Sequence, residues 1–205
     1  MDRPILVGVA GGTSAGKSTF AGRIAEAIGP ERALIIAESS YYFDRSHFRV
    51  DFPEQVNFDH PDSIDLVCME SHLKDLIAGR AVPQFHYHRD TGVREETGKM
   101  VEPRQVIIVE GILILAEEKI RSLLDIKIFI DADSDLRFIR RLERDLTEKG
   151  IPFEEICSSF LEKVKPMHLR FVMPSKRYAD IIVPMGGQNE AALEMVVSRI
   201  QSYLG

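Results

Sequence analysis

The chain has 205 residues, of which 44% are hydrophobic and 28% are charged. This length is enough for one well-buried domain and short for two, so we expect a single domain over residues 1–205. The formal net charge of -6 is spread along the chain and gives no general attraction to a nucleic acid polymer or an anionic membrane. No apolar run approaches the ~20 residues of a membrane span, and the start lacks a signal-peptide pattern, so we expect a cytoplasmic protein.

Short β-branched runs alternate with stretches of helical periodicity. This alternation predicts an α/β, doubly wound fold with a parallel sheet covered on both faces. The polar, glycine-containing segment 81–103 predicts a β-hairpin excursion outside the sheet. Strands are expected at Ile5–Val9, Ala33–Ala37, Val106–Val109, Ile126–Ile130 and Ile181–Val183, and helices at about Ser18–Ile28, Ile64–Ala78, Glu117–Leu124, Ser134–Lys149, Phe153–Lys165 and Asn189–Leu204.

A glycine loop follows the first expected strand and fits G-x-x-x-x-G-K-[ST]. Glycines let backbone N–H groups surround phosphate oxygens, the lysine reaches the outer phosphates, and the serine ligates Mg²⁺. A glycine-rich turn with a chance lysine is the alternative, and the strand before and helix after the loop make it improbable. The predicted ATP-binding residues are Gly11, Gly12, Thr13, Ser14, Ala15, Gly16, Lys17, Ser18 and Thr19.

A carboxylate ends the central buried strand, where Glu110 follows Val109. The carboxyl edge of such a strand lies beside the glycine loop, so Glu110 and Ser18 are the predicted ligands of Mg²⁺. The alternative is a strand-end glutamate in an ordinary surface ion pair.

The segment 133–150 is rich in arginine. Helical spacing places Ile139, Leu142 and Leu146 on one face and Arg137, Arg140, Arg141 and Arg144 on the other. These arginines predict a phosphate clamp within a mobile lid at about 134–165. The alternative is a solvated face on which glutamates such as Glu143 balance the arginines.

Five segments resemble the uridine/cytidine kinase family, in the same order and over nearly the whole chain. They are GVAGGTSAGKST, NFDHPDSIDL, VIIVEGIL, IFIDADSDLRFIRRLERD and VKPMHLRFVMPSKRYADIIVP. The resemblance implies a P-loop NTPase fold with a five-stranded parallel sheet, Mg²⁺-dependent transfer of the γ-phosphoryl group of ATP to the 5′-hydroxyl of a pyrimidine ribonucleoside, and a homo-oligomer, commonly a tetramer.

The resemblance also implies roles for individual residues. It assigns Lys17, Ser18 and Glu110 to ATP and magnesium, Arg144 to the phosphates, and Asp59 and Arg141 to the sugar hydroxyls. From the sequence alone Asp59 would be a turn residue ahead of a helix. Aromatic residues such as Phe58 and Tyr87 are candidates for stacking on a base.

One departure from the family falls at the catalytic position. Family members usually read D-S-Y-Y where this chain reads Ser39–Tyr42, and that aspartate accepts the proton of the attacking hydroxyl. Ser39 is a poor base at neutral pH. Glu38 is adjacent, but side chains of neighbours in an extended segment point to opposite faces, and Asp44 is a more flexible candidate. Our hypothesis is that Ser39 orients the nucleophile while a neighbouring carboxylate or water takes the proton, with Lys17, Arg141 and Arg144 as the other catalytic residues.

A second departure falls in the segment expected to contact the base. The family commonly shows Y-x-[FY]-x-x-H-x-R, whereas here Phe85 lacks a hydroxyl, Asp90 replaces the histidine and Gly92 the arginine. Ile151 and Ser159 likewise stand in place of an arginine and a glutamine. The predicted substrate-binding residues are Phe58, Asp59, Phe85, Tyr87, Asp90 and Arg141, and the alternative for the segment is an exposed polar hairpin.

Three functions remain open at this point. The first is a nucleoside 5′-kinase with altered base specificity or reduced activity. The second is a P-loop kinase of another small hydroxylated metabolite, and the third is a catalytically impaired ATP-binding regulatory protein. Fold alone does not choose among them.

Overall fold

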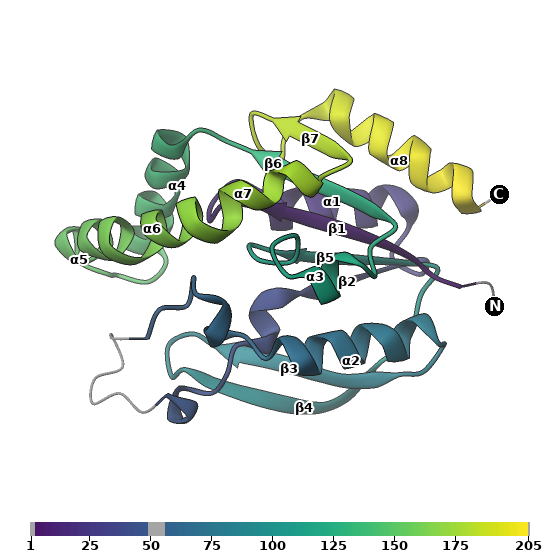
Figure 1. Ribbon diagram of the computed structural model, residues 1–205, viewed down its shortest axis with the longest axis horizontal. Coiled ribbons are helices and arrows are strands. Elements are labelled where there is room, and N and C mark those ends of the chain that lie inside the picture. Colours follow the sequence, from purple (N-terminus) through teal and green to yellow (C-terminus); the bar gives the residue numbers. More distant parts are fainter. Residues whose placement is uncertain (1–2, 49–55, 205) are drawn as a thin grey trace.

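A five-stranded parallel sheet forms the centre of the protein. The computed structural model describes residues 3–48 and 56–204, so residues 1–2, 49–55 and 205 of the expected domain lie outside the described part. The strand order is β2-β5-β1-β6-β7 (Figure 1). Every predicted strand is confirmed: β1 is Ile5–Gly11, β2 Ala33–Ala37, β5 Val106–Gly111, β6 Ile126–Asp131 and β7 Ile181–Pro184.

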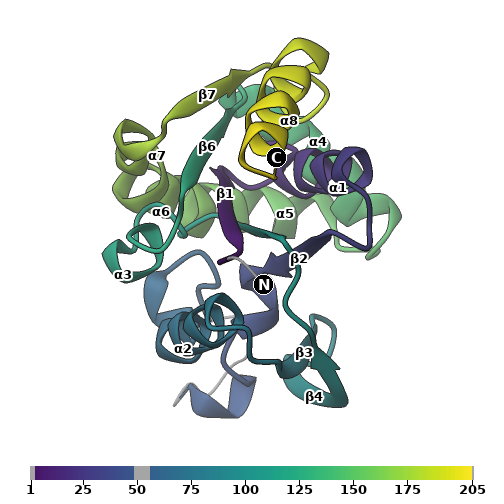
Figure 2. The same ribbon diagram turned by 90° about the vertical axis from the view of Figure 1, so that its right-hand side faces the viewer.

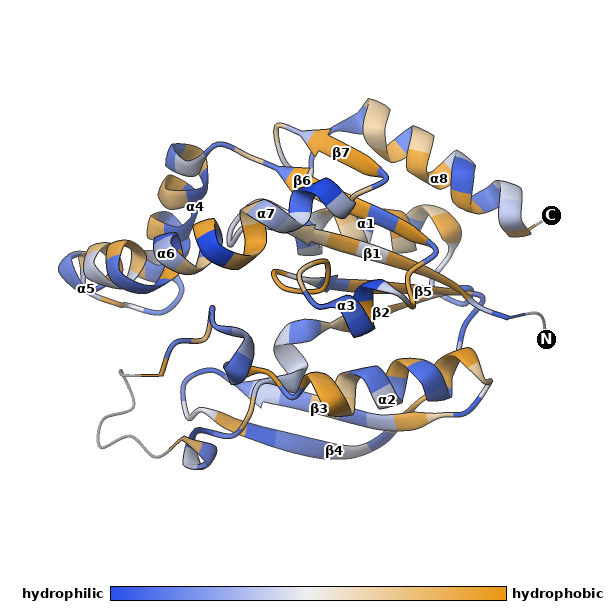
Figure 3. Ribbon diagram, in the orientation of Figure 1, coloured by the Kyte–Doolittle hydropathy of each residue, from blue (hydrophilic) through white to orange (hydrophobic). Residues whose placement is uncertain are grey.

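Two hydrophobic cores lie on opposite faces of this sheet. Alternate residues of β5 serve the two cores: Val106 and Ile108 face α1 (Lys17–Ile28) and α8 (Glu190–Leu204), whereas Ile107 and Val109 face α2 (Leu66–Ile77). Figure 2 shows α1 and α8 together on one side, with α2 and the short α3 (Glu118–Arg121) on the other. This two-sided burial is why the strands read as continuous apolar runs, which appear orange in Figure 3.

The predicted excursion is an antiparallel hairpin, β3 (Val82–His88) and β4 (Val93–Val101), in a separate two-stranded sheet. Most of β4 is exposed and polar, as Figure 3 shows. The hairpin is joined to the main body through ring contacts, including Tyr41 with Phe85 at 5.8 Å. These contacts fix the inner strand beside the turn that follows β2.

The helical stretch after α4 (Ser134–Thr147) is longer than predicted. The expected end near Lys165 is wrong, because helical turns continue to Tyr178 through α5 (Phe153–Ser159), α6 (Lys165–Met167) and α7 (Met173–Ser175). Two π-helical turns separate these pieces, and Pro166 and Pro174 each lie in the first turn of the piece that follows. A proline is tolerated there because its missing N–H needs no partner within that piece.

The predicted apolar face of α4 is also wrong. Ile139 and Leu146 are 50% and 40% exposed, while Arg137 is only 4% exposed. The reason is that the inner side of α4 meets the glycine loop, where the Arg137 guanidinium lies against Gly12. In the part of the chain that the structure describes, no helix is long and apolar enough to cross a bilayer.

Candidate active site

A large cavity of about 1390 Å³ lies at the carboxyl edge of the central strands. Its walls come from the glycine loop, from the turns after β2 and β5, from α4 and α5, and from the hairpin. This is where open α/β sheets bind ligands. The predicted site residues that it brings together are Thr13, Ser14, Gly16, Lys17, Ser18, Thr19, Ser39, Phe58, Asp59, Tyr87, Glu110, Arg141 and Arg144.

Five predicted site residues do not line this cavity. Phe85 packs against Tyr41 and His72, and Asp90 is exposed in the hairpin turn. Gly11, Gly12 and Ala15 belong to the glycine loop and are buried. The structure therefore gives Phe85 a packing contact where the sequence suggested a substrate contact.

The glycine loop has the backbone geometry of an anion cradle. It enters α1 through Gly16, whose φ of 99° is left-handed, and a Cβ there would lie 2.7 Å from the Gly187 nitrogen. Lys17 is buried and its Nζ donates to the Gly12 carbonyl at 3.0 Å. Burial lowers the pKa of Lys17, opposed by the charges of Glu110, Glu38 and Asp59. A cation held this way is positioned to attract phosphate oxygens.

Ser18 and Glu110 meet at the opening of this loop. The Ser18 hydroxyl donates to a Glu110 carboxylate oxygen at 3.0 Å, joining the start of α1 to the end of β5. Among the described residues there is no cluster of three histidine, cysteine or acidic side chains. One hydroxyl and one carboxylate fit Mg²⁺, which keeps several waters and takes its remaining ligands from a substrate phosphate.

Glu38 is a site residue that the sequence analysis set aside, on the expectation that its segment is extended. Residues Glu38–Tyr41 form a 3-10 turn and are not extended, so both Glu38 and Ser39 line the cavity. The Glu38 carboxylate accepts hydrogen bonds from the backbone nitrogens of Ile112 and Leu113 at 3.0 and 2.9 Å. Burial raises its pKa to about 7, although these hydrogen bonds and Lys17 act in the opposite direction.

Asp44, the other candidate carboxylate, is directed elsewhere. It accepts from the backbone and hydroxyl of Ser46 at 2.9 and 2.6 Å and does not line the cavity. These hydrogen bonds lower its pKa. Asp44 therefore caps its own turn, and of the two carboxylates considered for the missing aspartate only Glu38 reaches the cavity.

Another wall of the cavity combines Asp59 with an aromatic cluster. Burial raises the pKa of Asp59, against the charges of Arg141, Lys17 and Arg89. Tyr42 meets Phe58 and Tyr87 edge-on, with ring centroids 5.2 and 5.3 Å apart. A carboxylate beside an arginine can bind vicinal hydroxyls, and aromatic rings offer an apolar surface for a planar group.

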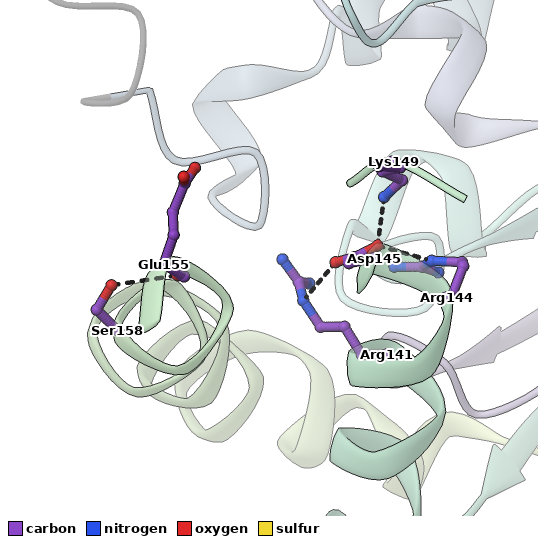
Figure 4. Close-up of polar contacts among 6 residues, drawn as sticks. All are labelled: Arg141, Arg144, Asp145, Lys149, Glu155 and Ser158. Carbon is purple, nitrogen blue, oxygen red and sulfur yellow. Dashed lines mark hydrogen bonds and ion pairs between the residues drawn. The ribbon is translucent and has the colours of Figure 1, made fainter. Parts of the chain in front are cut away.

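Asp145 organises the cationic wall on α4, as Figure 4 shows. Its buried carboxylate lies 3.3 Å from Arg141 Nε and 2.9 Å from Arg144 Nε, and it also pairs with Lys149. Burial alone would raise the pKa of Asp145, but the hydrogen bonds from Arg144 and Lys149 hold it below its ordinary value. Two arginines predicted to contact substrates are thus fixed by one carboxylate, which the sequence pattern did not reveal.

A glycine loop at a helix N-terminus, a Ser–Glu pair beside it and an arginine-rich wall across the same cavity define a P-loop kinase. The phosphoribulokinase/uridine kinase family model matches residues 6–192, and the chain belongs to that family.

Individual relatives agree with this assignment. The chain is 44% identical to a uridine kinase of Clostridium perfringens (strain SM101 / Type A), covering 100% of this chain and 99% of that protein. It is 47% identical to a uridine kinase of Chloroflexus aggregans, covering 98% and 96%. The solved phosphoribulokinase of Rhodobacter spheroides is 14% identical with a TM-score of 0.67, covering 92% of this chain and 73% of that one, and shares the fold.

Proposed function

We propose that this protein transfers the γ-phosphoryl group of ATP to the 5′-hydroxyl of a ribonucleoside, in the manner of a uridine kinase. One observation carries the proposal: Lys17 with the Ser18–Glu110 pair lies on one wall of a cavity, and Asp59 with Arg141 lies on another. Phosphate-binding and hydroxyl-binding groups therefore face a common space. The full-length similarity to proteins named uridine kinase supports the same acceptor class.

Each residue has a distinct part in this proposal. Backbone N–H groups of the glycine loop and Lys17 hold the phosphates, and Arg144 neutralises charge on the transferring group. Asp59 and Arg141 hold the ribose so that its hydroxyl is in line with the phosphorus. When bound, Mg²⁺ would be held by Ser18 and Glu110 and would neutralise charge on the phosphate oxygens.

Ser39 replaces the aspartate that would accept the proton of the hydroxyl. We expect Ser39 to orient the nucleophile by a hydrogen bond and Glu38 or a water to take the proton. Phosphoryl transfer depends mostly on positioning and charge stabilisation, so turnover without the aspartate is compatible with this site. The substitution also favours a second candidate, an ATP-binding regulatory protein that has lost catalysis.

The test is ADP release from purified protein with ATP, Mg²⁺ and a panel of ribonucleosides, small sugars and vitamins, with product masses measured. The proposal predicts a product one phosphoryl group heavier than the nucleoside, and loss of that product in Lys17→Met. ATP binding without any phosphorylated product would support the regulatory alternative. Phosphorylation of a small sugar or vitamin, but of no nucleoside, would replace the acceptor class.

A further inference from the structure

Two basic side chains pack against Gly12 of the glycine loop: Arg137 of α4, and His168 of the helical stretch that follows. None of the three residues lines the large cavity, and all three border a second, smaller cavity of about 490 Å³. A Cβ on Gly12 would lie 2.7 Å from Arg137 Nη1 and 3.0 Å from His168 Cε1. Position 12 therefore requires glycine, because a side chain there would displace both groups.

Gly12 joins Arg137 to the phosphate-binding lysine. The Nε of Arg137 donates to the Ala132 carbonyl at 3.1 Å, just before α4 begins, and the side chain is buried. The Gly12 carbonyl accepts from Lys17 Nζ at 3.0 Å and from the Ala15 nitrogen at 3.1 Å. Gly12 thus contacts a guanidinium and an ammonium, and the two cations are held at a fixed separation.

The charge of Arg137 has no ion-pair partner within the described ranges 3–48 and 56–204. Asp131 is the acid whose charge acts on it, and Asp131 pairs with Lys176 at 2.6 Å. Burial lowers the pKa of Arg137, but a guanidinium stays charged at neutral pH. Burial and the charges of Arg137 and Lys17 lower the pKa of His168 to about 4, so His168 adds no charge. A buried cation without a carboxylate costs free energy unless another anion compensates it.

The surroundings of Lys17 show what a second cation does at this site. The charges of Glu110, Glu38 and Asp59 all raise the pKa of Lys17, whereas Arg137 lowers it. Ionised carboxylates so close to Lys17 also repel phosphate. Arg137 opposes that repulsion from a position outside the cavity, where it takes no space from a nucleotide.

We propose that Arg137 is a positioning residue for the phosphates of ATP, which contacts Gly12 and not the nucleotide and whose positive charge acts through the glycine loop. The phosphates are then the anion that compensates this charge. A buried charge is screened little by solvent, so it acts across the thickness of a loop. The inference rests on the proposed function only for the use of ATP, and it adds to that function a residue from outside the cavity.

The affinities of ATP and AMP in three Arg137 variants test the proposal. They are measured with Mg²⁺ and without acceptor, by displacement of a fluorescent ATP analogue. Arg137→Met and Arg137→Gln are neutral and should weaken ATP binding about tenfold. The affinity for AMP, which lacks the β- and γ-phosphates, should change less than about twofold. Arg137→Lys keeps the charge and should bind ATP within about threefold of the unaltered protein.

Lys165→Met is the matched control, because it removes a positive charge from an exposed position on the same second cavity. It should leave both affinities unchanged.

Three results overturn the proposal: unchanged ATP affinity in the neutral variants, equal weakening of ATP and AMP, or a loss in Arg137→Lys as large as in the neutral variants. Unfolding of both neutral variants without nucleotide, seen by circular dichroism, also overturns it and assigns the charge to stability. Because no acceptor is present, failure to phosphorylate any nucleoside and failure of this inference are separate results.

Discussion

At the residue scale, Ser39 is expected to lower the rate of phosphoryl transfer. A neutral hydroxyl is a poor base and does not accept the proton that the attacking hydroxyl must lose. We predict that Ser39→Asp raises kcat with the best nucleoside by about a hundredfold or more, the usual contribution of a general base. Steady-state ADP release measures this change. Ser39→Asn, which has a similar size and no basic oxygen, should show no such gain, and equal rates in all three proteins would contradict a proton-transfer role at this position.

Glu38 predicts a pH dependence of stability. Its pKa is about 7 in the folded protein and close to the ordinary 4.5 when unfolded, so the folded state binds the additional proton between these values. The contribution of Glu38 to the free energy of unfolding is therefore largest below pH 4.5 and falls by roughly 3 kcal/mol as the pH rises to 7 and beyond. Glu38→Gln should remove this fall, as measured by urea unfolding from pH 4.5 to 8. Parallel curves for the two proteins would exclude a raised pKa.

Some site residues could be predicted from the sequence and others could not. The glycine loop and Glu110 could be placed from sequence because a strand, a turn and a helix in order define their geometry. Glu38 could not, because its direction depends on a 3-10 turn and on two backbone nitrogens from beyond β5. Phe85 was assigned to substrate by position in a motif, but the fold packs it against His72.

At the scale of elements, Asp145 of α4 holds two arginines of its own helix, Arg141 and Arg144, by ion pairs. We predict that Asp145→Asn lowers kcat/KM by about tenfold or more, since Arg141 and Arg144 lose their common partner and repel each other. Hydrogen exchange across 134–149 should accelerate in the same variant. Glu143→Gln, at an exposed position of the same helix, is the control and should leave both measurements unchanged. Unchanged exchange in Asp145→Asn would show that the arginines are fixed by other contacts.

Helices and strands were predictable where their own sequence determines them and were not where contacts with distant residues decide. The central strands β5, β1 and β6 were predictable because burial on both faces demands continuous apolar runs, and the edge strands β2 and β7 because they are short β-branched runs as well. The helical continuation to Tyr178 was not, since it depends on two π-helical turns, each followed by a short helical piece with a proline in its first turn. The buried face of α4 was assigned wrongly because Arg137 packs on Gly12, a tertiary contact that overrides hydrophobic periodicity.

At the scale of the whole molecule, the sheet brings two walls of the cavity to one edge: the wall with Lys17, Ser18 and Glu110, and the wall with Asp59 and Arg141. Segments distant in sequence, including Ser18, Asp59, Glu110 and Arg141, meet only because β5 lies beside β1 and the turns leave at the carboxyl ends. The central claim is that these walls act together on the 5′-hydroxyl of a ribonucleoside.

The most direct measurement of that claim is the mass of the product formed from ATP, Mg²⁺ and the best nucleoside of the panel, beside its 5′-deoxy analogue. The account predicts a nucleoside 5′-monophosphate from the first and no phosphorylated product from the second, although both bind. Phosphorylation of the 5′-deoxy analogue would contradict the proposed position of transfer, and absence of product from every nucleoside would contradict the proposed reaction.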